Sequence, residues 1–293
     1  MTHLQGRPSV AAMVMTYRPD ASVIDRLELI RPQVDRLFVV DNGSPAQLAG
    51  PIREWLERAG GTFVANDRNM GVGVALNQGA RAAIGAGADW LLTLDQDTNP
   101  PPDLVETMLD AVAGWERPGR VGICGPTTDH QRDNRCADAV AVRRRLVITS
   151  GSLLSLAAYR RGGPFREDYF IDMVEAEYAF RLARLGYDVI LACRASIDHR
   201  IGEPTSHQLR GVSLSTTNHP AWRRYYLTRN RVFVWRANWR QAPAWVAFDT
   251  FGHMRDTLSM TLFETDRRRK LRHTMRGAAD GLRGRSGERV RPG

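Results

Sequence analysis

The sequence of 293 residues contains no long apolar run. A membrane-spanning helix needs roughly 20 mostly apolar residues in succession, so the sequence predicts none. Residues 1–20 also lack the basic segment, apolar core and small-residue cleavage site of a secretory signal peptide. With 43% apolar and 25% charged residues, the composition is that of a globular protein. We therefore expect a cytoplasmic protein.

Cysteine is scarce, and its three positions are Cys124, Cys136 and Cys193. Their number is odd, and their spacing shows none of the close pairs that mark a disulfide framework or a cysteine-type zinc site. We therefore expect all three side chains to pack in the core.

Charge is almost balanced over most of the chain, although the total is +9. Residues 267–293 hold ten Lys or Arg against two acidic residues, which gives +8 there and leaves +1 for residues 1–266. A nearly neutral body without aromatic-rich RNA-binding motifs argues against a nucleic-acid-binding protein. We expect no specific nucleic-acid partner and a strongly basic C-terminal tail.

The first hundred residues alternate between the patterns of strands and helices. Repeated strand-then-helix units imply parallel strands joined by right-handed crossovers, which is a Rossmann-like α/β architecture. The expected strands are 9–17, 35–41, 61–67 and 89–95, and the expected helices are 19–33, 45–60 and 72–87.

The regular alternation fades after a helix expected at 101–115. Further strands are expected at 120–126, within 141–156 and at 187–199, and a helix is expected at 172–186. Residues 200–219 have no periodicity and read as a long loop, either a mobile lid carrying Arg200, His207 and Arg210 or a disordered surface excursion. From residue 220 the pattern is helical to about residue 272, and the last twenty residues are expected to be disordered.

Two acids stand at the end of the strand in "WLLTLDQDTNP". Ligands of open α/β sheets collect beyond the carboxyl ends of the strands, where Asp95 and Asp97 are expected. Carboxylates so close together are costly unless a cation such as Mg²⁺ or Mn²⁺ neutralises them. His199 follows another extended segment and could add an imidazole nitrogen. The alternatives are that Asp97 or Asn99 caps the next helix and that His199 is packed or capping.

Two further segments place polar groups or glycines at strand ends. Asp41 in "VVDNGS" could accept a hydrogen bond from a nucleotide base, or it could merely close an Asx turn. Gly71 and Gly73 precede a helix, where backbone N–H groups can meet a phosphate. A tight turn explains these glycines equally well.

The helix near "FIDMVEAEYAFRL" carries three acids. Asp172 and Glu175 share a face, whereas Glu177 lies about 200° round the helix from Glu175. Glu177 has Arg181 four residues on, the favourable order for a helical ion pair, so we interpret it as structural. Glu175 has Ala179 four residues on instead of an arginine, so it is the better candidate for a general base, with a solvated helix face as the alternative.

Eight segments in order resemble the family 2 glycosyltransferases of the GT-A fold, over roughly residues 10–235. They are "MVMTYRPD", "VVDNGS", "NMGVGVALNQG", "LLTLDQDT", "SGSLLS", "FIDMVEAEYAFRLARLGYDV", "HRIG" and "RRYYLTRNRVF". The sequence is most similar to the bacterial rhamnosyltransferase-like branch, which is related to galactofuranosyltransferases. The resemblance implies a mostly parallel central sheet flanked by helices, with a helical C-terminal extension.

This resemblance implies a division of the chain. Residues 1–218 would form the GT-A domain, with a nucleotide-binding half over about 8–100 and a catalytic and acceptor half over about 101–218. Residues 219–272 would form the helical region, and residues 273–293 the basic, disordered tail.

The resemblance also implies a reaction. The protein would be an inverting, metal-dependent transferase that moves a sugar, L-rhamnose from dTDP-rhamnose, to a hydroxyl of a glycan or lipid-linked acceptor in cell-envelope polysaccharide biosynthesis. The alternatives are a galactofuranosyl- or hexosyltransferase that uses a UDP-sugar, and a non-catalytic nucleotide-binding scaffold protein.

Site residues follow from the same resemblance. Glu175 falls at the position of the family's base, where relatives usually have Asp, and this departure leaves Asp172 as the alternative base. Asp97 matches the main metal ligand, with Asp95 facing the ribose or the metal and His199 as a further ligand. The positions that match the donor site are Thr16, Tyr17, Asp41, Asn69, Gly71, Asn77 and Asp95.

The basic tail also fits an enzyme that acts on lipid-linked glycans. An anionic membrane attracts a polybasic segment by about 1 kcal/mol for each Lys or Arg near its surface. We therefore expect peripheral association with the inner face of the cell membrane through residues 267–293. The dense aromatic residues at 222–239 are more typical of a helical core than of a membrane interface.

Overall fold

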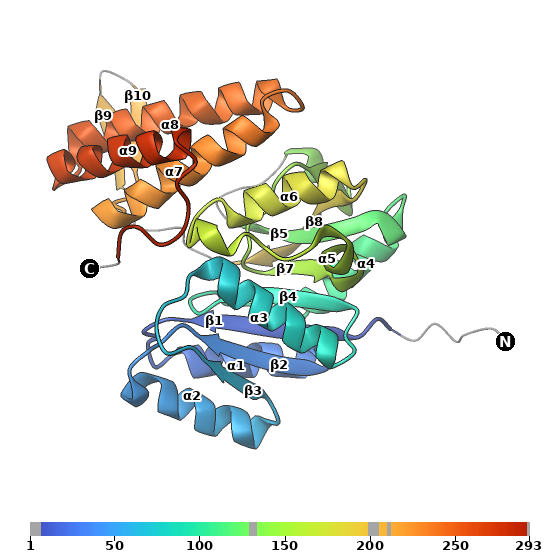
Figure 1. The fold of residues 1–293 in the computed structure, drawn as a ribbon. Helices are drawn as coiled ribbons and strands as arrows, with labels where there is room; N and C mark the ends of the chain where they lie inside the picture. The colour runs from blue at the N-terminus through green and yellow to red at the C-terminus, as the bar shows by residue number, and fades with distance from the viewer. Residues whose placement is uncertain (1–6, 129–133, 199–204, 210–211, 292–293) are drawn as a thin grey trace. The chain divides into compact units, whose positions relative to one another are not determined.

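The computed structural model describes residues 7–128, 134–198, 205–209 and 212–291. The chain divides into two compact units (Figure 1). The first comprises Met1–Arg166 and Glu175–His199, and the second comprises Glu167–Val174 and Arg200–Gly293. The expected domain boundary after residue 218 differs from this division, which also assigns the short segment before Glu175 to the second unit.

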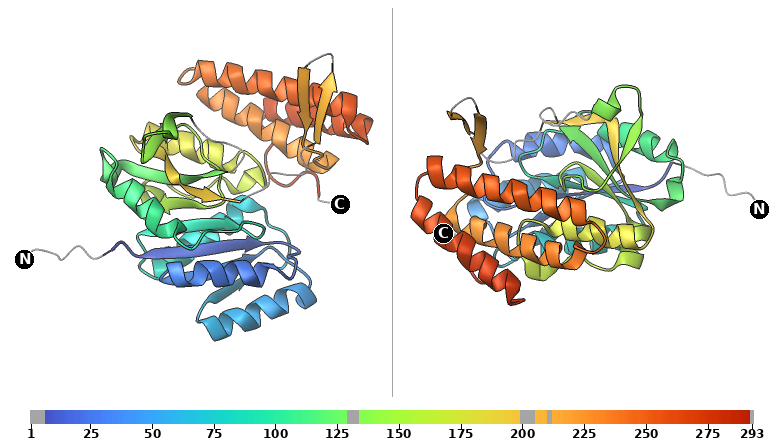
Figure 2. Two further views of the ribbon diagram at one scale, coloured as in Figure 1. Left: turned by 180° about the vertical axis from the view of Figure 1, so that it is seen from behind. Right: turned by 90° about the horizontal axis from the view of Figure 1, so that it is seen from above.

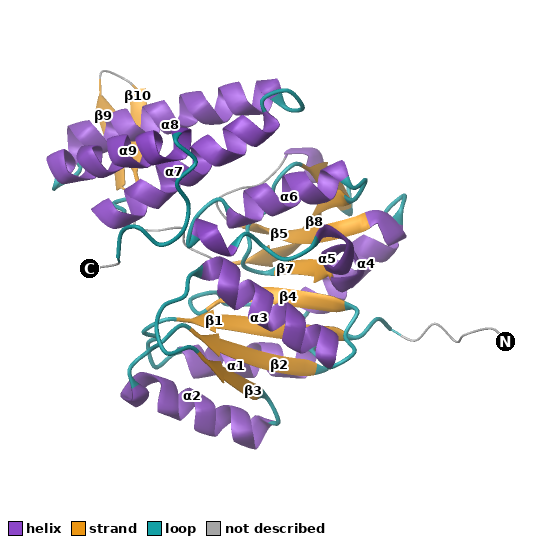
Figure 3. Ribbon diagram, viewed as in Figure 1, coloured by secondary structure: helices purple, strands orange, loops and turns teal. Residues whose placement is uncertain are grey.

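The first unit is built on an eight-stranded sheet in the order β3-β2-β1-β4-β7-β5-β8-β6 (Figure 3). Strands β1 to β4 are mutually parallel, as predicted, and β5 is parallel to β8. Strand β7 is antiparallel to both β4 and β5, and β6 is antiparallel to β8. The strands are β1 Val10–Thr16, β2 Arg36–Asp41, β3 Thr62–Ala65, β4 Trp90–Asp95, β5 Val121–Thr128, β6 Ala141–Arg144, β7 Ser152–Ser155 and β8 Asp188–Ile197.

Helices cover both faces of this sheet. Helices α3, α5 and α6 lie over the face seen in Figure 1, and α1 and α4 lie over the other face, seen from behind in Figure 2. Both sides of the central strands are therefore buried, which is why β1 and β4 read as near-continuous apolar runs. The helices are α1 Val23–Ile30, α2 Ala46–Ala59, α3 Val72–Gly85, α4 Leu104–Ala113, α5 Leu156–Gly162 and α6 Val174–Arg184, with 3₁₀ turns η1 Arg31–Gln33, η2 Pro118–Arg120 and η3 Asn134–Cys136.

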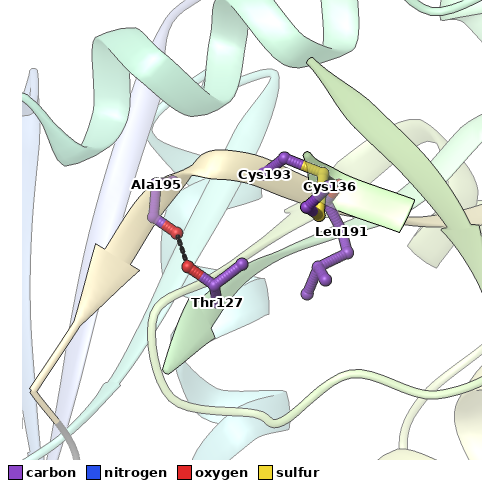
Figure 4. Close-up of a disulfide and its surroundings, with 5 residues drawn as sticks. All are labelled: Thr127, Cys136, Leu191, Cys193 and Ala195. Atoms are coloured by element: carbon purple, nitrogen blue, oxygen red, sulfur yellow. Dashed lines mark hydrogen bonds between the residues drawn. A yellow bond between two sulfur atoms is a disulfide. The ribbon is translucent and has the colours of Figure 1, made fainter. Parts of the chain in front are cut away.

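Two of the three cysteines form a disulfide, which corrects the expectation of core packing. Cys136 in η3 is bonded to Cys193 in β8, 57 residues later in the sequence (Figure 4). Near it the hydroxyl of Thr127 donates to the carbonyl oxygen of Ala195 at 2.8 Å, where the β5–β8 register shifts. Cys124 is buried as expected, and burial raises the pKa of its thiol to about 12, which leaves the thiol unreactive.

The second unit consists of three helices and a hairpin. Helices α7 Ala221–Asn238, α8 Pro243–Phe263 and α9 Arg267–Leu282 pack against one another (Figure 2), and the short 3₁₀ turn η4 spans Glu167–Tyr169. Strands β9 Thr205–Leu209 and β10 Val212–Thr216 pair antiparallel. The long loop expected over 200–219 is therefore wrong for these strands, and Arg200 and Arg210 lie outside the described residues.

The disordered tail expected from residue 273 is also wrong for the described residues. Residues 273–282 complete α9, in which Thr274, Gly277 and Asp280 are buried. Beyond the helix, the Tyr226 hydroxyl donates to the carbonyl oxygen of Val290 at 2.7 Å. The segment is ordered because its small residues pack on α7. A Cβ added at Gly277 would lie 2.4 Å from the backbone oxygen of Tyr225.

A buried ionic network joins the three helices of this unit. Arg224 on α7 is almost wholly buried and pairs with Asp256 on α8 and with Glu264, at 2.5 and 2.8 Å. Glu264 also pairs with Lys270 of α9 at 2.7 Å. Buried charges are tolerated only when they are paired in this way. Tyr225 and Tyr226 of α7 are fully buried core residues, as the sequence suggests for most aromatic residues of this segment, whereas Trp239 at its end is exposed.

Candidate functional site

The strand directions bring the polar strand ends together at one edge of the sheet. Strands β1, β2 and β4 are parallel, so Thr16, Asp41 and Asp95 end them at the same edge. Because β7 runs antiparallel to both neighbours, β5 and β8 again point the same way as β4. The carboxyl end of β8, at Asp198, therefore reaches this edge as well, and this is where α/β folds bind their ligands.

A tight turn after β4 presents the two predicted acids. Thr98 N–H donates to the carbonyl oxygen of Asp95 at 3.2 Å, and Asp95 N–H donates to the Ser150 hydroxyl at 2.9 Å. The Asp95 side chain is half-buried and that of Asp97 is exposed. Helix α4 begins only at Leu104 and has no side-chain cap. The alternative that Asp97 caps this helix is therefore wrong.

Three side chains hold this turn in place, and two of them, Gln96 and Arg26, were not among the candidates from the sequence. Gln96 accepts from the backbone N–H of Tyr17 at 2.8 Å, which joins the turn to the end of β1. Arg26 of α1 donates to the carbonyl oxygen of Gln96 at 2.9 Å and to the side chain of Asn99 at 3.1 Å. The unbroken run of polar residues from 95 to 99 is the signal that could have identified Gln96, whereas no local signal marks Arg26.

The end of β8 is paired to the same turn. Asn99 N–H donates to the carbonyl oxygen of Asp198 at 3.3 Å, and the two residues form an isolated β-bridge. His199 follows Asp198 directly in the sequence but lies outside the described residues. The role of His199 as a metal ligand therefore stays a prediction. Asp198, the residue before it, is paired with the turn that carries Asp97.

The acids of the turn suit a hard divalent cation. Within the part of the chain that the structure describes, no three His, Cys, Asp or Glu side chains gather as a metal site. Asp95 and Asp97 supply two carboxylates, and Mg²⁺ is commonly held by one or two carboxylates together with substrate phosphates. The residues present therefore fit a cation that binds together with a diphosphate.

Asp41 has a structural task at the end of β2. Its carboxylate accepts hydrogen bonds from the hydroxyls of Thr16 and Ser44 at 2.8 and 2.6 Å, and from the backbone N–H groups of Gly43 and Ser44 at 3.1 and 2.7 Å. The bonds from the two backbone N–H groups close an Asx turn, which was one of the two roles expected for Asp41. Any contact of Asp41 with a nucleotide stays a prediction, as it does for Thr16, whose side chain is buried.

The loop between β3 and α3 packs against the Asp41 turn. Gly43 has a φ of 81°, and a Cβ there would lie 2.5 Å from the Cα of Arg68, so only glycine allows this approach. Asn69 accepts from Gly71 N–H at 2.9 Å, and Gly71, with a φ of 89°, stands at the N-cap of α3. Asn69 and Gly71 thus shape the start of α3, and their predicted contact with the donor stays a prediction.

Asn77 has partners inside the protein. It lies inside α3 with no exposed surface. Its amide accepts from Phe165 N–H at 2.8 Å and from the Tyr159 hydroxyl at 2.9 Å, and it donates to the carbonyl oxygen of Phe165 at 3.0 Å. The side chain therefore ties α3 to α5 and to the segment after it, and a place beside the nucleotide stays a prediction.

The three acids around the start of α6 differ in their partners. Glu177 pairs with Arg181 at 2.5 Å, which confirms the predicted helical ion pair. Asp172, in the second unit, pairs with Arg223 at 2.9 Å. Half-buried Glu175, in the first unit, lines a small cavity of about 30 Å³ together with residues of β4, β5 and β7.

That cavity indicates where Glu175 lies. Thr93, two residues before Asp95 on β4, and Ser152 on β7 line it with Glu175. It has room for one or two water molecules only, so a sugar would have to bind outside it. Glu175 therefore lies near the carboxyl end of β4, and its part as the base stays a prediction.

The chain is similar in sequence to known glycosyltransferases. Residues 14–137 match the model of the family described as Glycosyl transferase family 2. A dTDP-rhamnosyl transferase, RfbF of Shigella flexneri, is 24% identical over 245 residues, which are 78% of this chain and 81% of that protein. The galactofuranosyltransferase GlfT1 of Mycolicibacterium smegmatis is 27% identical over 263 residues, 80% of this chain and 84% of that protein.

Solved structures show the same fold at low sequence identity. The mannosyltransferase PcManGT from Pyrobaculum calidifontis, in complex with GDP-Man and Mn²⁺, matches with a TM-score of 0.64 and 16% identity over 95% of this chain and 88% of that one. S. aureus TarS in complex with UDP-GlcNAc matches with a TM-score of 0.54 and 10% identity, over 94% and 73% of the two chains. The protein is therefore a glycosyltransferase that carries a family 2 domain on a GT-A fold.

Proposed function

We propose that the protein transfers L-rhamnose from dTDP-rhamnose, with inversion, to a hydroxyl of a glycan or lipid-linked acceptor in cell-envelope polysaccharide biosynthesis. The observation that carries the proposal is the edge of the sheet where Asp95 and Asp97 stand beside the ends of β1, β2 and β8. The choice of donor is supported by similarity to a dTDP-rhamnosyl transferase. Similarity to a galactofuranosyltransferase favours a UDP-sugar as the second candidate.

Asp97, Asp95 and His199 are the residues that would hold a divalent cation. Such an ion, when bound, supplies positive charge against the diphosphate as the bond to the sugar breaks. The protein itself fixes the positions of Asp95 and Asp97 before the donor binds. The backbone of Asp95 is bonded to Ser150, and the turn is tethered through Gln96 and Asn99, so little reorganisation is needed when the donor binds.

Glu175 is proposed as the general base. Its carboxylate takes the proton from the acceptor hydroxyl, whose oxygen attacks the anomeric carbon as the nucleoside diphosphate departs. Glu175 falls at the position of the family's base and lines a cavity with Thr93 of β4, which supports Glu175 among the three acids. Glu reaches about 1.5 Å further than the Asp that relatives usually carry, and its similar intrinsic pKa preserves the chemistry.

Substitution tests the assignment of the base. We expect Glu175→Gln to lower turnover by about 10² to 10⁴ while dTDP still raises the thermal midpoint of the variant. Glu177→Gln is the matched control, because it removes an acid of the same helix and should retain most of the turnover. If Glu175→Gln stays active while Asp172→Asn is inactive but folded, Asp172 is the base instead.

The donor is tested by thermal stabilisation with dTDP, UDP and GDP and their sugar conjugates, with and without Mn²⁺ or Mg²⁺. We expect a shift with dTDP that needs the ion and is lost in Asp97→Ala, with Asp110→Ala, an exposed acid of α4, as the control. A preference for UDP would instead support the galactofuranosyl or hexosyl alternative. No shift with any nucleotide would favour the non-catalytic scaffold.

We also propose that the protein associates with the inner face of the cell membrane through its basic C-terminal segment, residues 267–293. No helix among the described residues has the length and apolar character to cross a bilayer. Because Lys270 and Asp280 of this segment are buried, deleting it would damage the fold. Replacing the exposed residues Arg267, Arg268 and Arg269 with Gln is therefore the better test, and we expect weaker binding to anionic vesicles.

A further inference from the structure

Helix α8 of the second unit exposes its apolar side chains. Five of them recur every three or four residues, so they form one stripe along the helix. Between 45% and 78% of each residue's surface is exposed. They are Phe248, Phe251, Met254, Leu258 and Leu262. We call this stripe the α8 apolar face, and a contiguous exposed patch of this kind marks an interaction surface.

The opposite side of α8 is polar and faces the protein. Asp249 accepts from the indole N–H of Trp235 at 2.8 Å and pairs with Arg231 at 3.2 Å. Asp256 pairs with buried Arg224. Turning the helix to bury its apolar side chains would take Asp256 away from buried Arg224 and Asp249 away from Arg231 and Trp235, which is unfavourable. The outward direction of the α8 apolar face is therefore set by the fold.

The helical unit that carries this face is strongly positive. Residues 221–291 hold seventeen Lys or Arg against six Asp or Glu, a net charge of +11. On α8 the exposed charged residue is Arg255, while both acids face α7. Helix α9 packs against α8 and adds five exposed arginines. These are Arg267, Arg268, Arg269, Arg272 and Arg276.

An apolar stripe on a positively charged unit indicates what binds to the α8 apolar face. A second copy docked through the same face would bring two segments of net charge +11 together, and the repulsion opposes that contact. An anionic bilayer offers an apolar layer for the phenylalanines and negative headgroups for the arginines, and amphipathic helices bind membranes in this way. We propose that the α8 apolar face lies at the boundary between headgroups and acyl chains of an anionic phospholipid membrane, with α9 beside the headgroups.

This inference deepens the proposed membrane association by naming the surface that makes it, and it holds whichever sugar is transferred. It assigns the apolar contact to α8, so the basic segment alone would bind weakly. Membrane binding should therefore depend on apolar side chains as well as on charge, and part of it should persist at high salt, which screens only the charges.

Binding of the full chain to phosphatidylcholine vesicles, with and without phosphatidylglycerol, tests the proposal. We expect Phe248→Ser with Phe251→Ser to lower the partition coefficient at least about tenfold. Leu29→Ser with Leu48→Ser is the matched control, since these residues are exposed on helices of the first unit, and it should bind as the wild type does. A polarity-sensitive dye on Phe251→Cys should report an apolar environment with anionic vesicles, and the same dye on Leu48→Cys should not.

Two outcomes would overturn the proposal. One is vesicle binding by the double phenylalanine variant as tight as that of the wild type. The other is a wild-type dimer that separates on the same substitutions, which would assign the face to a second copy. The dTDP-induced thermal shift, measured on every variant, shows that each is folded. It also distinguishes failure of this proposal from failure of the donor assignment, because a chain that binds dTDP but no vesicle refutes only the membrane contact.

Discussion

Asn230 of α7 holds the segment that leads into α6, and replacing it should loosen that segment. Its side-chain N–H groups donate to the backbone carbonyl oxygens of Tyr169, Ile171 and Asp172 at 2.9, 2.7 and 2.9 Å. Asn230 itself is fully buried. Helix α6 begins two residues after this segment, at Val174, directly before the proposed base.

The segment needs this support because its backbone is strained. Phe170, Asp172 and Met173 have φ angles of 66°, 62° and 64°, in the left-handed region that non-glycine residues rarely adopt. Each such residue costs on the order of 1–3 kcal/mol and persists only where its surroundings hold it. The amide of Asn230 therefore contributes to a conformation that the local sequence alone would not maintain.

The size of the effect follows from the hydrogen bonds. An amide nitrogen has two hydrogens, so about two of the three contacts are full hydrogen bonds, and each buried acceptor left unsatisfied costs about 1–3 kcal/mol. Because the carbonyl oxygen of Tyr169 also accepts from Arg229, the lower part of that range applies. We expect Asn230→Ala to lower the free energy of opening this segment by about 2–4 kcal/mol.

Hydrogen exchange is the assay, because it measures local opening without assuming that the two units unfold together. A loss of 2–4 kcal/mol corresponds to exchange roughly 30 to 1,000 times faster over residues 167–174. Asn238→Ala is the matched control. Asn238 is an equally buried asparagine of the same helix that donates to Val234 within α7. Equal exchange over 167–174 in the two variants would refute the reasoning.

Three further predictions follow from the buried groups. Glu264→Gln leaves two buried cations without their shared acid and should lower the free energy of unfolding by about 3–5 kcal/mol in urea denaturation; a loss below about 1 kcal/mol would contradict the network. Burial, with two neighbouring arginines, lowers the pKa of His253 to about 3. The imidazole is protonated near pH 6.5 in the unfolded chain but only near pH 3 in the folded chain. The free energy of unfolding should therefore fall between pH 6.5 and 3 by up to about 1.4 kcal/mol per pH unit, and less steeply in His253→Gln. Equal slopes of the free energy of unfolding against pH in the two proteins would exclude His253 as the cause. Reducing the disulfide, or replacing it by Cys136→Ser with Cys193→Ser, should lower the free energy of unfolding by about 2–4 kcal/mol. The thermal midpoint of the wild type should therefore fall when reductant is added, and that of the double variant should not change.

Local patterns in the sequence were sufficient for the first half of the fold and part of the site. Parallel strands and their crossover helices follow from apolar runs punctuated by glycine and proline, because burial on both faces of a sheet requires such runs. Asp95 and Asp97 were placed at a strand end for the same reason. The ion pair between Glu177 and Arg181 was predictable because helical neighbours four residues apart must meet.

Features that depend on distant residues required the tertiary structure. The disulfide joins cysteines 57 residues apart, a pairing that no local spacing indicates. The hydrogen bonds of Asn77 could not be predicted either, because its partners Tyr159 and Phe165 lie more than 80 residues away in the sequence. The hairpin of β9 and β10 has the polar composition of a loop, since a two-stranded ribbon needs little apolar sequence.

Helix α8 shows the division between sequence and structure most directly. Its sequence determines that acids lie on one side and large apolar residues on the other, because the helical period of 3.6 residues sorts them. Which side faces the protein depends on arginines that α7 supplies from 18 to 32 positions away, through Arg231 with Asp249 and Arg224 with Asp256. Only the packed structure could therefore decide that the apolar side chains point outward, because burial depends on contacts between elements and not on the pattern within one.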